Sequence, residues 1–480
     1  MHGEAKFMKY STAMAEFNAR FTGKRVSVIG IGVSNRPLVT LLTEAGAIVT
    51  ARDKKPREAL GDVAAEFEAC GVRLVTGEGY LDGIDDEILF RTPGMRYDHP
   101  KLREAVEGGA ILTSEMQVFF ELCPATVIGI TGSDGKTTTT TLISEMLKAE
   151  GKRVFLGGNI GRPLLPDLTE MTADDYCVIE LSSFQLHTMT LSPHIAVITN
   201  LSPNHLDYHT DVREYIEAKF NIFLHQKAGD RLVFNHQSRS SLDTILTETV
   251  TMSSLPHTYS TFNAYKPKAA PDDVSEEDGM IYCGDTPVLA ASDIKIPGRH
   301  NIENYMAAIA ALWGIVSVES IRKVARTFGG VPHRIELVRT LDGVAYYNSS
   351  IDSSPSRTLA ALAAFHGKPL ILLMGGYDKK LDYTPLGSPL CRLAKAVILT
   401  GATKNAIKEA ILSSPDYRKG APEIQLTDSY ADSVALAHRM AREGDTVLLS
   451  PASASFDAFK NFEERGNFFK SLVNALTEKE

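Results

Sequence analysis

The chain has 480 residues, of which 44% are hydrophobic, and a formal net charge of −9. This acidic balance argues against nucleic acid as a partner, because a phosphate backbone recruits a basic protein face. The five cysteines are scattered and form no C-x-x-C pair, so they indicate reduced thiols rather than a zinc site or a disulfide framework. No stretch approaches the ~18 apolar residues of a membrane span and no signal peptide is visible, so we expect a cytoplasmic protein without membrane contact.

Short apolar runs alternate with helical patterns along most of the chain. This alternation is typical of α/β domains built on parallel sheets. A chain of this length has room for about three domains of roughly 150 residues each. A break at Cys123-Pro124 and a new α/β run after residues 328–334 place the expected domains at 1–123, 124–330 and 331–480.

The first domain begins with an apolar run that ends in a glycine turn. Residues 25–32 (RVSVIGIG) predict a strand that runs into this turn, and residues 47–53 predict a second strand that ends at Asp53. The pattern suggests a dinucleotide fold, in which the turn holds phosphate and an acidic residue about 20 residues later binds a ribose. Asn35 replaces the third glycine of that pattern. A structural turn and a nucleotide-diphosphate site are therefore both open here.

A second glycine loop opens the central domain. The apolar run at 125–130 predicts a strand, and apolar residues recur at helical spacing after Lys136. A glycine loop between a strand and a helix N-terminus favours a P-loop, because its N–H groups and the helix end both attract an anion. Lys136 would reach the nucleotide phosphates, and Thr137 would place a hydroxyl on Mg²⁺. Ile130 stands where the strict pattern has its first glycine, so a glycine turn capped by threonines is the alternative.

A lysine interrupts the apolar face of the helix predicted over residues 211–225. Apolar residues recur at i, i+3, i+4, i+8 and i+11 from Val212, and Lys219 falls at i+7, inside this stripe. A buried ammonium is unfavourable, so such a lysine extends to solvent, is paired, or loses its proton. The functional alternative to the usual solvent-directed side chain is a desolvated amine that acts as a nucleophile or takes up CO₂ to become an anionic carbamate.

Two predicted strand ends near the P-loop carry side chains that can bind metal ions. Glu180 ends one apolar run, and the loop after the next run carries His205, Asp207 and His209. The carboxyl ends of parallel strands are where an α/β sheet binds its ligand, and oxygen-rich ligand sets favour Mg²⁺. A metal site and a loop of hydrogen-bonded histidines are equally compatible with this pattern.

Seven motifs, in the same order, resemble those of the Mur ligases. They lie at residues 129–139, 157–161, 179–186, 199–209, 214–220, 297–308 and 332–336. Residues 375–383 and 448–469 are most similar to the D-glutamate-adding members, and the D-N-P-R tetrad of the diaminopimelate- or lysine-adding members is absent. The glycine loop of this family starts at Gly132 here, which accounts for Ile130.

The resemblance implies an ATP-dependent, ADP-forming ligase that adds D-glutamate to UDP-N-acetylmuramoyl-L-alanine through an acyl phosphate, in peptidoglycan precursor synthesis. It implies an N-terminal Rossmann-like domain for the UDP substrate, a central P-loop ATPase-like domain with a parallel sheet, and a C-terminal Rossmann-like domain for the amino acid. Two Mg²⁺ ions and a carbamate on Lys219 are also expected, in a protein that acts as a monomer.

The same resemblance implies roles for individual residues. ATP would be bound by Gly132, Ser133, Asp134, Gly135, Lys136, Thr137, Thr138, Asn301, Asn304 and Arg334. The UDP substrate would be bound by Val33, Ser34, Asp53, Gly94 and Asn159. D-Glutamate would be bound by Lys379, Ser455 and Phe462. The metal ions would be held by Thr137, Glu180, His205 and Lys219, and the expected catalytic set is Lys136, His205 and Lys219.

One stretch departs from the pattern of the family. Many relatives have Asp-Ser-Lys where this chain has Ser349, Ser350 and Ile351, and Asp352 is the nearest acidic replacement. Two alternatives stay open: another Mur-type amino-acid ligase, or a catalytically weak Mur-like protein that binds nucleotide. A dehydrogenase is less compatible with the sequence, because Asn35 breaks the dinucleotide pattern and the P-loop would have no role.

Overall fold

The computed structural model describes residues 12–32, 35–202, 205, 208–235, 258–263, 273–365 and 367–479. The chain forms two compact units, one comprising Met1–Ala291 with Ile302–Val324 and the other Ser292–Asn301 with Ala325–Glu480. Within the described residues the first unit contains two sheets and the second contains one. Each expected domain therefore holds one sheet, and the independence of the three domains stays a prediction.

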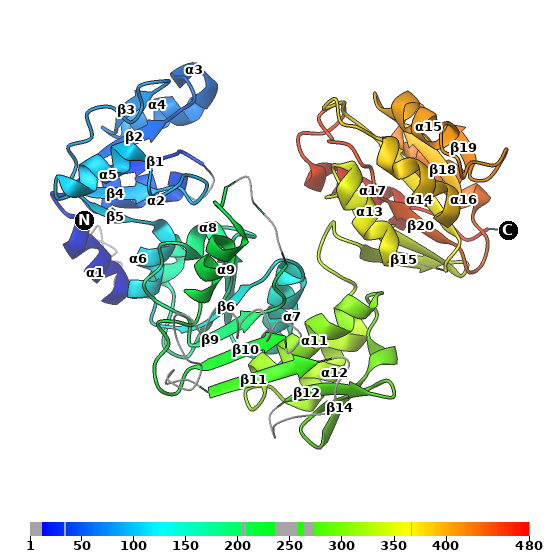
Figure 1. Ribbon diagram of the computed structural model, residues 1–480, viewed down its shortest axis with the longest axis horizontal. Coiled ribbons are helices and arrows are strands. Elements are labelled where there is room, and N and C mark those ends of the chain that lie inside the picture. The colour runs from blue at the N-terminus through cyan, green and yellow to red at the C-terminus, as the bar shows by residue number, and fades with distance from the viewer. Residues whose placement is uncertain are drawn as a thin grey trace, which may run out of the picture. The chain divides into compact units, whose positions relative to one another are not determined.

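The N-terminal sheet has five parallel strands among the described residues, in the order β3-β2-β1-β4-β5 (Figure 1). Its strands are β1 (Arg25–Ile29), β2 (Ile48–Asp53), β3 (Arg73–Thr76), β4 (Ile88–Arg91) and β5 (Ile111–Thr113). The helices here are α1 (Thr12–Phe21), α2 (Asn35–Glu44), α3 (Arg57–Leu60), α4 (Asp62–Ala69), α5 (Pro100–Glu107) and α6 (Glu115–Leu122). The strand order reverses at β1, so the turn after β1 lies at the switch point where α/β sheets bind ligands.

The central sheet has nine strands among the described residues, in the order β14-β13-β12-β11-β10-β9-β6-β8-β7. The run from β12 to β7 is parallel, and β13 and β14 are added antiparallel. The strands are β6 (Thr126–Thr131), β7 (Val154–Gly158), β8 (Tyr176–Glu180), β9 (Ile195–Ile198), β10 (Arg231–Asn235), β11 (Thr258–Asn263), β12 (Val274–Glu277), β13 (Met280–Cys283) and β14 (Thr286–Ala290). The helices are α7 (Lys136–Ala149), η1 (Leu165–Thr169), α8 (Ser183–Leu186), α9 (Val212–Phe220), η4 (Ala291–Asp293), α11 (Arg299–Leu312) and α12 (Val318–Thr327).

One hydrophobic core is continuous through the first unit, from the N-terminal sheet to the central sheet. Phe17 and Phe21 of α1 pack with ring centroids 4.7 Å apart, and Phe21 lies 5.6 Å from Phe90 of β4. The same core continues through Phe119 of α6 to Val127 of β6. Helix α6 therefore buries apolar side chains between the strands that carry the two glycine turns.

The C-terminal sheet has six strands among the described residues, in the order β15-β16-β20-β17-β18-β19, and only β15 is antiparallel to its neighbour. Its strands are β15 (Glu336–Leu341), β16 (Val344–Asn348), β17 (Leu370–Gly375), β18 (Ala394–Thr400), β19 (Glu423–Leu426) and β20 (Thr446–Leu449). The helices are α13 (Pro355–Ala363), η5 (Thr384–Leu386), α14 (Gly387–Leu393), α15 (Lys404–Leu412), α16 (Tyr430–Met440) and α17 (Phe462–Asn474).

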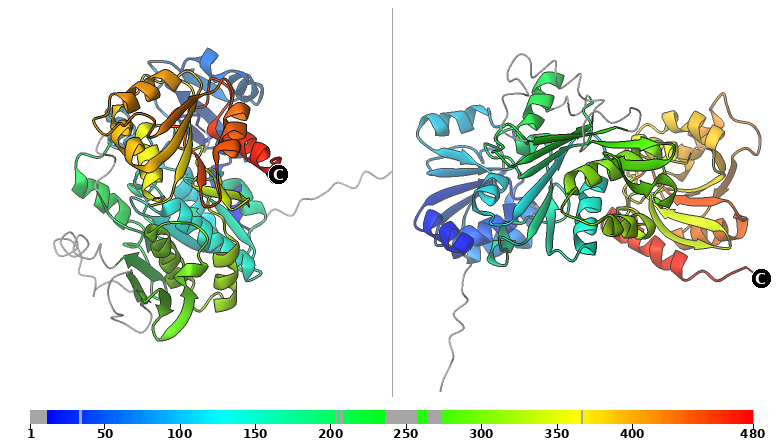
Figure 2. Two further views of the ribbon diagram at one scale, coloured as in Figure 1. Left: turned by 90° about the vertical axis from the view of Figure 1, so that its right-hand side faces the viewer. Right: turned by 90° about the horizontal axis from the view of Figure 1, so that it is seen from below.

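Alternate residues of this sheet enter two separate cores, because successive side chains of a strand point to opposite faces. Tyr346 and Ile371 pack with residues of α16 and α17, whereas Tyr347 and Leu370 pack with residues of α13, α14 and α15 (Figure 1, Figure 2). Helices thus cover both faces, as the expected Rossmann-like architecture requires.

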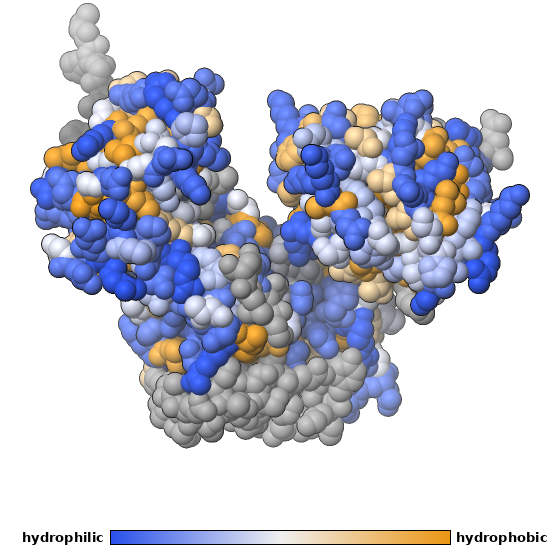
Figure 3. Space-filling model, turned by 45° about the horizontal axis from the view of Figure 1, so that its top comes forward, coloured by the Kyte–Doolittle hydropathy of each residue, from blue (hydrophilic) through white to orange (hydrophobic). Residues whose placement is uncertain are grey.

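Polar residues predominate on the face shown in Figure 3. On the coloured part of that face, hydrophilic residues cover most of the area, and hydrophobic residues form small groups. No helix in the described part of the chain is long and apolar enough to cross a membrane. All five cysteines are free thiols, as expected, although Cys123 and Cys177 lie 3.7 Å apart at their Sγ atoms.

Candidate active site

The glycine loop of the central sheet lies between β6 and α7, as predicted. Gly132 has φ 149° and Gly135 has φ 77°. A Cβ atom on Gly132 would overlap the Thr199 hydroxyl, and one on Gly135 would overlap the Asn304 side chain. Both positions therefore need glycine, because the backbone turns sharply against its neighbours. The Thr139 N–H donates to the carbonyl of Gly135, at the start of α7, at 2.9 Å.

Residues of the loop after β9 and of α9 hold this loop in shape. The Ser133 hydroxyl donates to the Ser202 carbonyl at 2.7 Å and lies 3.0 Å from the Tyr215 hydroxyl. The Ser133 N–H donates to the Asn200 carbonyl at 3.0 Å, and the Asp134 N–H donates to the Asn200 side-chain oxygen at 2.9 Å. These contacts hold the loop at the N-terminus of α7, where backbone N–H groups attract an anion.

Lys136 folds back over the loop. Its Nζ donates to the carbonyls of Gly132 at 2.9 Å and Ser133 at 3.0 Å. The ammonium therefore lies at the loop and the helix N-terminus, where a phosphate carries its charge. This position is the one that the P-loop interpretation requires of Lys136.

Glu180 lies at the end of β8, directly beside the first turn of α7. The Thr137 hydroxyl donates to one oxygen of Glu180 at 2.7 Å, and the Asn159 amide donates to the other at 2.8 Å. The carboxylate is 2% exposed. Two expected Mg²⁺ ligands, Thr137 and Glu180, thus touch each other, and Asn159, expected near the UDP substrate, contacts their carboxylate.

Lys219 is buried beneath the same loop. Its Nζ donates to the Gly132 carbonyl at 3.0 Å and the Thr131 hydroxyl at 3.3 Å, and it lies 4.7 Å from the centre of the Tyr215 ring. The side chain is 2% exposed, so the ordinary alternative, a lysine that extends to solvent, is wrong. Burial lowers the pKa of Lys219 well below its usual range and Lys136 lowers it further, whereas Glu180 opposes the shift. An uncharged amine is the form that takes up CO₂.

His205 approaches this group from the loop after β9. It has a left-handed backbone, with φ 54°, and its carbonyl accepts from the N–H groups of Tyr208 and His209. Its ring lies edge-on to Phe184 at 5.1 Å and 6.3 Å from Tyr215, the ring that Lys219 also contacts. Asp207 lies outside the described residues.

The glycine turn of the N-terminal sheet is braced by polar side chains at the end of β2 and the start of α2. Asp53 accepts the N–H of Ile31 at 2.7 Å and that of Lys55 at 2.8 Å. The Asn35 amide donates to the Gly30 carbonyl at 2.8 Å. The expected UDP contacts Val33 and Ser34 lie outside the described residues, whereas Gly94 lies in the turn after β4, the next strand of the sheet. Asp53 therefore shapes the turn, whatever ligand it receives.

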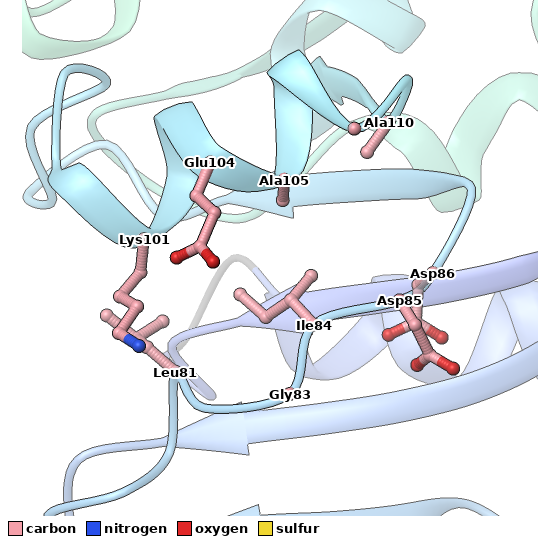
Figure 4. Close-up of a pocket in the computed structure, with 10 residues that line it drawn as sticks. Leu81, Gly83, Ile84, Asp85, Asp86, Lys101, Glu104, Ala105 and Ala110 are labelled. Carbon is pink, nitrogen blue, oxygen red and sulfur yellow. The ribbon is translucent and has the colours of Figure 1, made fainter.

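A cavity of about 300 Å³ lies near the amino end of β4 in this sheet (Figure 4). Asp85 and Asp86, which precede β4, line it with Lys101 and Glu104 of α5. It is separate from the turns after β1 and β4, because those turns follow the carboxyl ends of their strands.

The second unit contains most of the remaining expected contacts. Lys379 Nζ lies 5.3 Å from the centre of the exposed Phe456 ring. Ser455 is 2% exposed, and the Phe462 carbonyl accepts from the Ser350 hydroxyl at 2.7 Å. The Asn301 amide donates to the Pro297 carbonyl at 2.6 Å, and Arg334 follows the left-handed His333. Asn304, three residues after Asn301 on α11, belongs to the first unit, where it contacts Thr139 at 3.2 Å.

Two features of this unit bear on the unusual 349–351 stretch. Asp352 is buried and accepts from the Ser450 hydroxyl at 2.8 Å, so its carboxyl group belongs to the core. Sequence reasoning missed Arg465, which is fully buried and donates to the Ser350 carbonyl at 2.8 Å and the Ala454 carbonyl at 3.0 Å. Arg465 ties the 349–351 stretch to the loop that carries Ser455, and its position in a family motif was the available signal.

A P-loop beside a buried lysine and a buried carboxylate, in a chain of three α/β sheets, defines a nucleotide-using enzyme of the ligase type. The Mur ligase middle domain matches residues 130–312, and the Mur ligase glutamate ligase domain matches residues 333–453. The chain belongs to the Mur ligase family.

Among curated relatives, UDP-N-acetylmuramoylalanine–D-glutamate ligase of Acetivibrio thermocellus is 48% identical, over 97% of this chain and 99% of that protein. The protein of the same name from Clostridium botulinum is 49% identical, over 94% of this chain and 97% of its own length. Solved structures share the fold at lower identity. A UDP-N-acetylmuramoyl-L-alanyl-D-glutamate–2,6-diaminopimelate ligase matches with TM-score 0.55 and 17% identity, covering 99% of this chain and 97% of its own. A UDP-N-acetylmuramate–alanine ligase of Thermotoga maritima matches with TM-score 0.54 and 16% identity, covering 94% and 99%.

The expected fold class is confirmed: α/β, with an N-terminal Rossmann-like sheet, a central P-loop sheet and a C-terminal Rossmann-like sheet in chain order. The roles of the single residues stay predictions.

Proposed function

We propose that this protein is an ATP-dependent, ADP-forming ligase that joins D-glutamate to UDP-N-acetylmuramoyl-L-alanine in the cytoplasmic synthesis of peptidoglycan precursors. The observation that carries the proposal is identity of 48–49% to D-glutamate ligases over nearly the whole chain. The arrangement of Lys136, Glu180 and Lys219 around one loop supports it, because phosphoryl transfer needs positive charge and metal ligands at one point.

ATP binds with its phosphates at the glycine loop. The N–H groups at the start of α7 receive the phosphate oxygens, and Lys136 exchanges its contacts with the Gly132 and Ser133 carbonyls for the terminal phosphate. Asn200, absent from the expected set, supports ATP binding indirectly by holding the loop backbone.

Mg²⁺ would be held by Thr137, Glu180, His205 and a carbamate on Lys219, in two sites. The donor set fits, because it offers hydroxyl and carboxylate oxygens, one imidazole, and a buried amine whose pKa is lowered enough to react with CO₂. When bound, Mg²⁺ offsets negative charge on the transferring phosphoryl group. In the chain itself, Asn159 and the Thr137 hydroxyl hold the Glu180 carboxylate in one orientation.

The reaction proceeds by two displacements. The terminal carboxylate of UDP-N-acetylmuramoyl-L-alanine attacks the γ-phosphorus of ATP, releasing ADP and giving an acyl phosphate. The amine of D-glutamate then attacks the acyl carbon, loses a proton, and phosphate leaves. Lys136 stabilises charge on the phosphoryl group in the first step. His205 serves as a metal ligand rather than as the base.

The substrates bind on different sheets. The UDP part lies at the switch point of the N-terminal sheet, against Val33, Ser34, Asp53 and Gly94. D-Glutamate is bound in the second unit, where Lys379 supplies a positive charge for its carboxylates and Ser455 and Phe462 line the same region.

A substrate panel tests the proposal. The purified protein is incubated with ATP, Mg²⁺, UDP-N-acetylmuramoyl-L-alanine and one amino acid at a time, and phosphate release and the peptide product are measured. Release with D-glutamate alone is expected, and Lys136→Ala, which lacks the phosphate-binding ammonium, should release none. Release with L-lysine but not D-glutamate would assign the protein to another Mur-type ligase.

The substituted 349–351 stretch favours one other function, a catalytically weak Mur-like protein that binds nucleotide. A protein of this kind should bind ADP in a calorimetric measurement and release no phosphate with any amino acid of the panel.

A further inference from the structure

An arginine of the N-terminal sheet is bound to the helix that carries Lys219. The Arg96 guanidinium donates to both oxygens of Glu214, at 2.9 and 3.2 Å, and to both oxygens of Asp98, at 2.8 and 2.9 Å. It also donates to the Tyr208 carbonyl at 2.8 Å. Fork-to-fork contacts of this kind fix direction as well as distance, and lysine cannot reproduce them.

Glu214 connects this arginine to the expected metal ligands. It lies in the first turn of α9, where the Asp211 side chain caps its N–H at 2.8 Å, and Lys219 follows five residues later on the same helix. Its carboxylate also accepts the Thr210 N–H at 2.6 Å. The hydrogen bonds from Arg96 are the main cause that lowers the pKa of Glu214 to about 2, so the pair is ionised at any physiological pH.

The other end of the arginine lies in the turn that contains Gly94. Residues 92–98 form this turn, which we call the β4 turn. The Tyr208 hydroxyl donates to the carbonyls of Pro93 at 3.3 Å and Met95 at 3.2 Å. The buried Arg91 donates to the Pro93 carbonyl at 3.0 Å and to the Thr188 hydroxyl at 3.1 Å. The β4 turn is therefore tied to the segment that begins at His205.

Within the described residues, His187, His209 and Glu214 are close enough together to suggest a metal site. Arg96 argues against it, because its guanidinium and the Thr210 N–H already use the oxygens of Glu214. A divalent cation would then lie beside a fixed positive charge. The His209 ring instead lies 2.9 Å from the Ser183 hydroxyl and 3.5 Å from the Glu214 carboxylate.

We propose that Arg96 and Glu214 form a positioning pair that couples the β4 turn, where the UDP substrate binds, to the metal ligands His205 and Lys219. The coupling rests on the proposed function. It runs along two short routes: from Arg96 through Glu214 along α9 to Lys219, and from Arg96 through the Tyr208 backbone to the His205 carbonyl. A UDP substrate that orders the β4 turn therefore favours the arrangement of ligands that binds Mg²⁺, and Mg²⁺ favours UDP-substrate binding by the same factor.

The test uses Arg96→Lys, Glu214→Gln and the double variant in the full chain. For each protein, KM for UDP-N-acetylmuramoyl-L-alanine, kcat, and the Mg²⁺ concentration for half-maximal rate are measured at saturating ATP. Each single variant should raise KM and the Mg²⁺ requirement about tenfold, and the double variant should be no worse than the worse single variant, because both remove one interaction. The matched control is the exposed Arg213–Glu217 pair on the same helix, where Arg213→Lys and Glu217→Gln should leave all three values unchanged.

Binding measurements separate coupling from a merely structural role. Affinity for the UDP substrate is measured by calorimetry with and without Mg²⁺, and ADP affinity and the melting temperature are measured on each variant. The wild type should bind the UDP substrate more tightly with Mg²⁺, and the variants should lose this difference while keeping ADP affinity. Additive effects in the double variant, or an unchanged Mg²⁺ dependence, would overturn the proposal. If Arg96→Lys does not fold, the kinetic and binding measurements on Glu214→Gln test the proposal by themselves. An inactive wild type whose UDP-substrate affinity still depends on Mg²⁺ through this pair would refute the proposed activity and retain the coupling.

Discussion

Two glycine turns in this protein follow an interior strand of a sheet and precede a helix, yet they are held in different ways. The loop after β6 is held by Asn200, which lies in the loop after the neighbouring strand β9. Its two glycines also lie against Thr199 and Asn304, which leave no room for a Cβ atom. The turn after β1 is held by the carboxylate of Asp53, at the end of the neighbouring strand β2, which accepts the Ile31 N–H. A Cβ atom on Gly30 would also be too close to a neighbour, so both turns are tightly packed. They differ in the side chain that accepts a turn N–H, which is an uncharged amide for the β6 loop and a charged carboxylate for the β1 turn.

The buried amine beneath the β6 loop has no counterpart among the described contacts of the β1 turn, and its removal should have the largest effect. Lys219→Ala should lower the rate of phosphate release by about 10³-fold, because the expected carbamate and its Mg²⁺ would be lost. Short carboxylates in the buffer should restore part of the rate by occupying the vacated space. The exposed Lys227, changed to Ala, serves as the control and should retain full activity. Full activity in Lys219→Ala would contradict a role for a carbamate on Lys219.

The comparison of the two turns can be made directly with one substitution in each. Gly132→Ala should lower the rate about 10²-fold and the free energy of unfolding by about 1–3 kcal/mol, because the new methyl group overlaps Thr199 and φ is unfavourable for alanine. Gly32→Ala meets nothing within 4 Å and should change the free energy of unfolding by less than about 0.5 kcal/mol. Denaturant unfolding measures both values. Equal destabilisation at the two positions would mean that a Cβ atom is accommodated no better at Gly32 than at Gly132.

The carboxylate of the β1 turn should affect only the UDP substrate. Asp53→Asn keeps one oxygen acceptor for the two N–H groups of Ile31 and Lys55, and it removes the charge that strengthens both bonds. KM for UDP-N-acetylmuramoyl-L-alanine should rise about tenfold, which corresponds to one charge-assisted hydrogen bond. ADP affinity, measured by calorimetry, should stay within about twofold. A rise in both constants would contradict a local role for Asp53.

The same contrast explains what the sequence predicted. The β6 strand and α7 were predicted within one residue, because apolar spacing and a glycine loop are local signals. Lys219 was recognisable because it interrupts an apolar stripe. Helix α9 ends at Phe220 rather than at residue 225, since the chain turns there and the Ile222 N–H donates to the Lys219 carbonyl three residues back.

The side chains that hold the site could not be predicted in the same way. Asn200, Arg96 and Arg465 act on residues 66, 118 and 115 positions away in the sequence, at Asp134, Glu214 and Ser350 respectively. Asn200 and Arg465 lie in motifs, but no local pattern shows which distant residue each one contacts, because the fold brings the partners together. The residues with expected roles were therefore visible in the motifs, whereas the contacts that hold them were not.

Helix α6, between the two sheets, contains a carboxyl group whose ionisation should affect stability alone. Glu115 is buried, and its Oε1 accepts the Leu165 N–H at 3.3 Å. Burial raises the pKa of Glu115 to about 7 from its ordinary value of 4.5, so the folded protein retains a proton that the unfolded chain releases. The stabilising contribution is complete below pH 4.5 and is lost as the pH rises through about 7.

Glu115→Gln keeps the oxygen acceptor and cannot ionise, so it should be more stable than the wild type by about 1–3 kcal/mol at pH 8 and about equal to it at pH 4.5. Urea unfolding across this range measures the difference, with the exposed Glu16→Gln on α1 as the control that should show no such trend. A constant difference between variant and wild type at every pH would mean that Glu115 has the same proton occupancy folded and unfolded. Because Glu115 lies apart from both glycine turns, KM for ATP and for the UDP substrate should not change, so any change there would mean that α6 transmits strain between the two sheets.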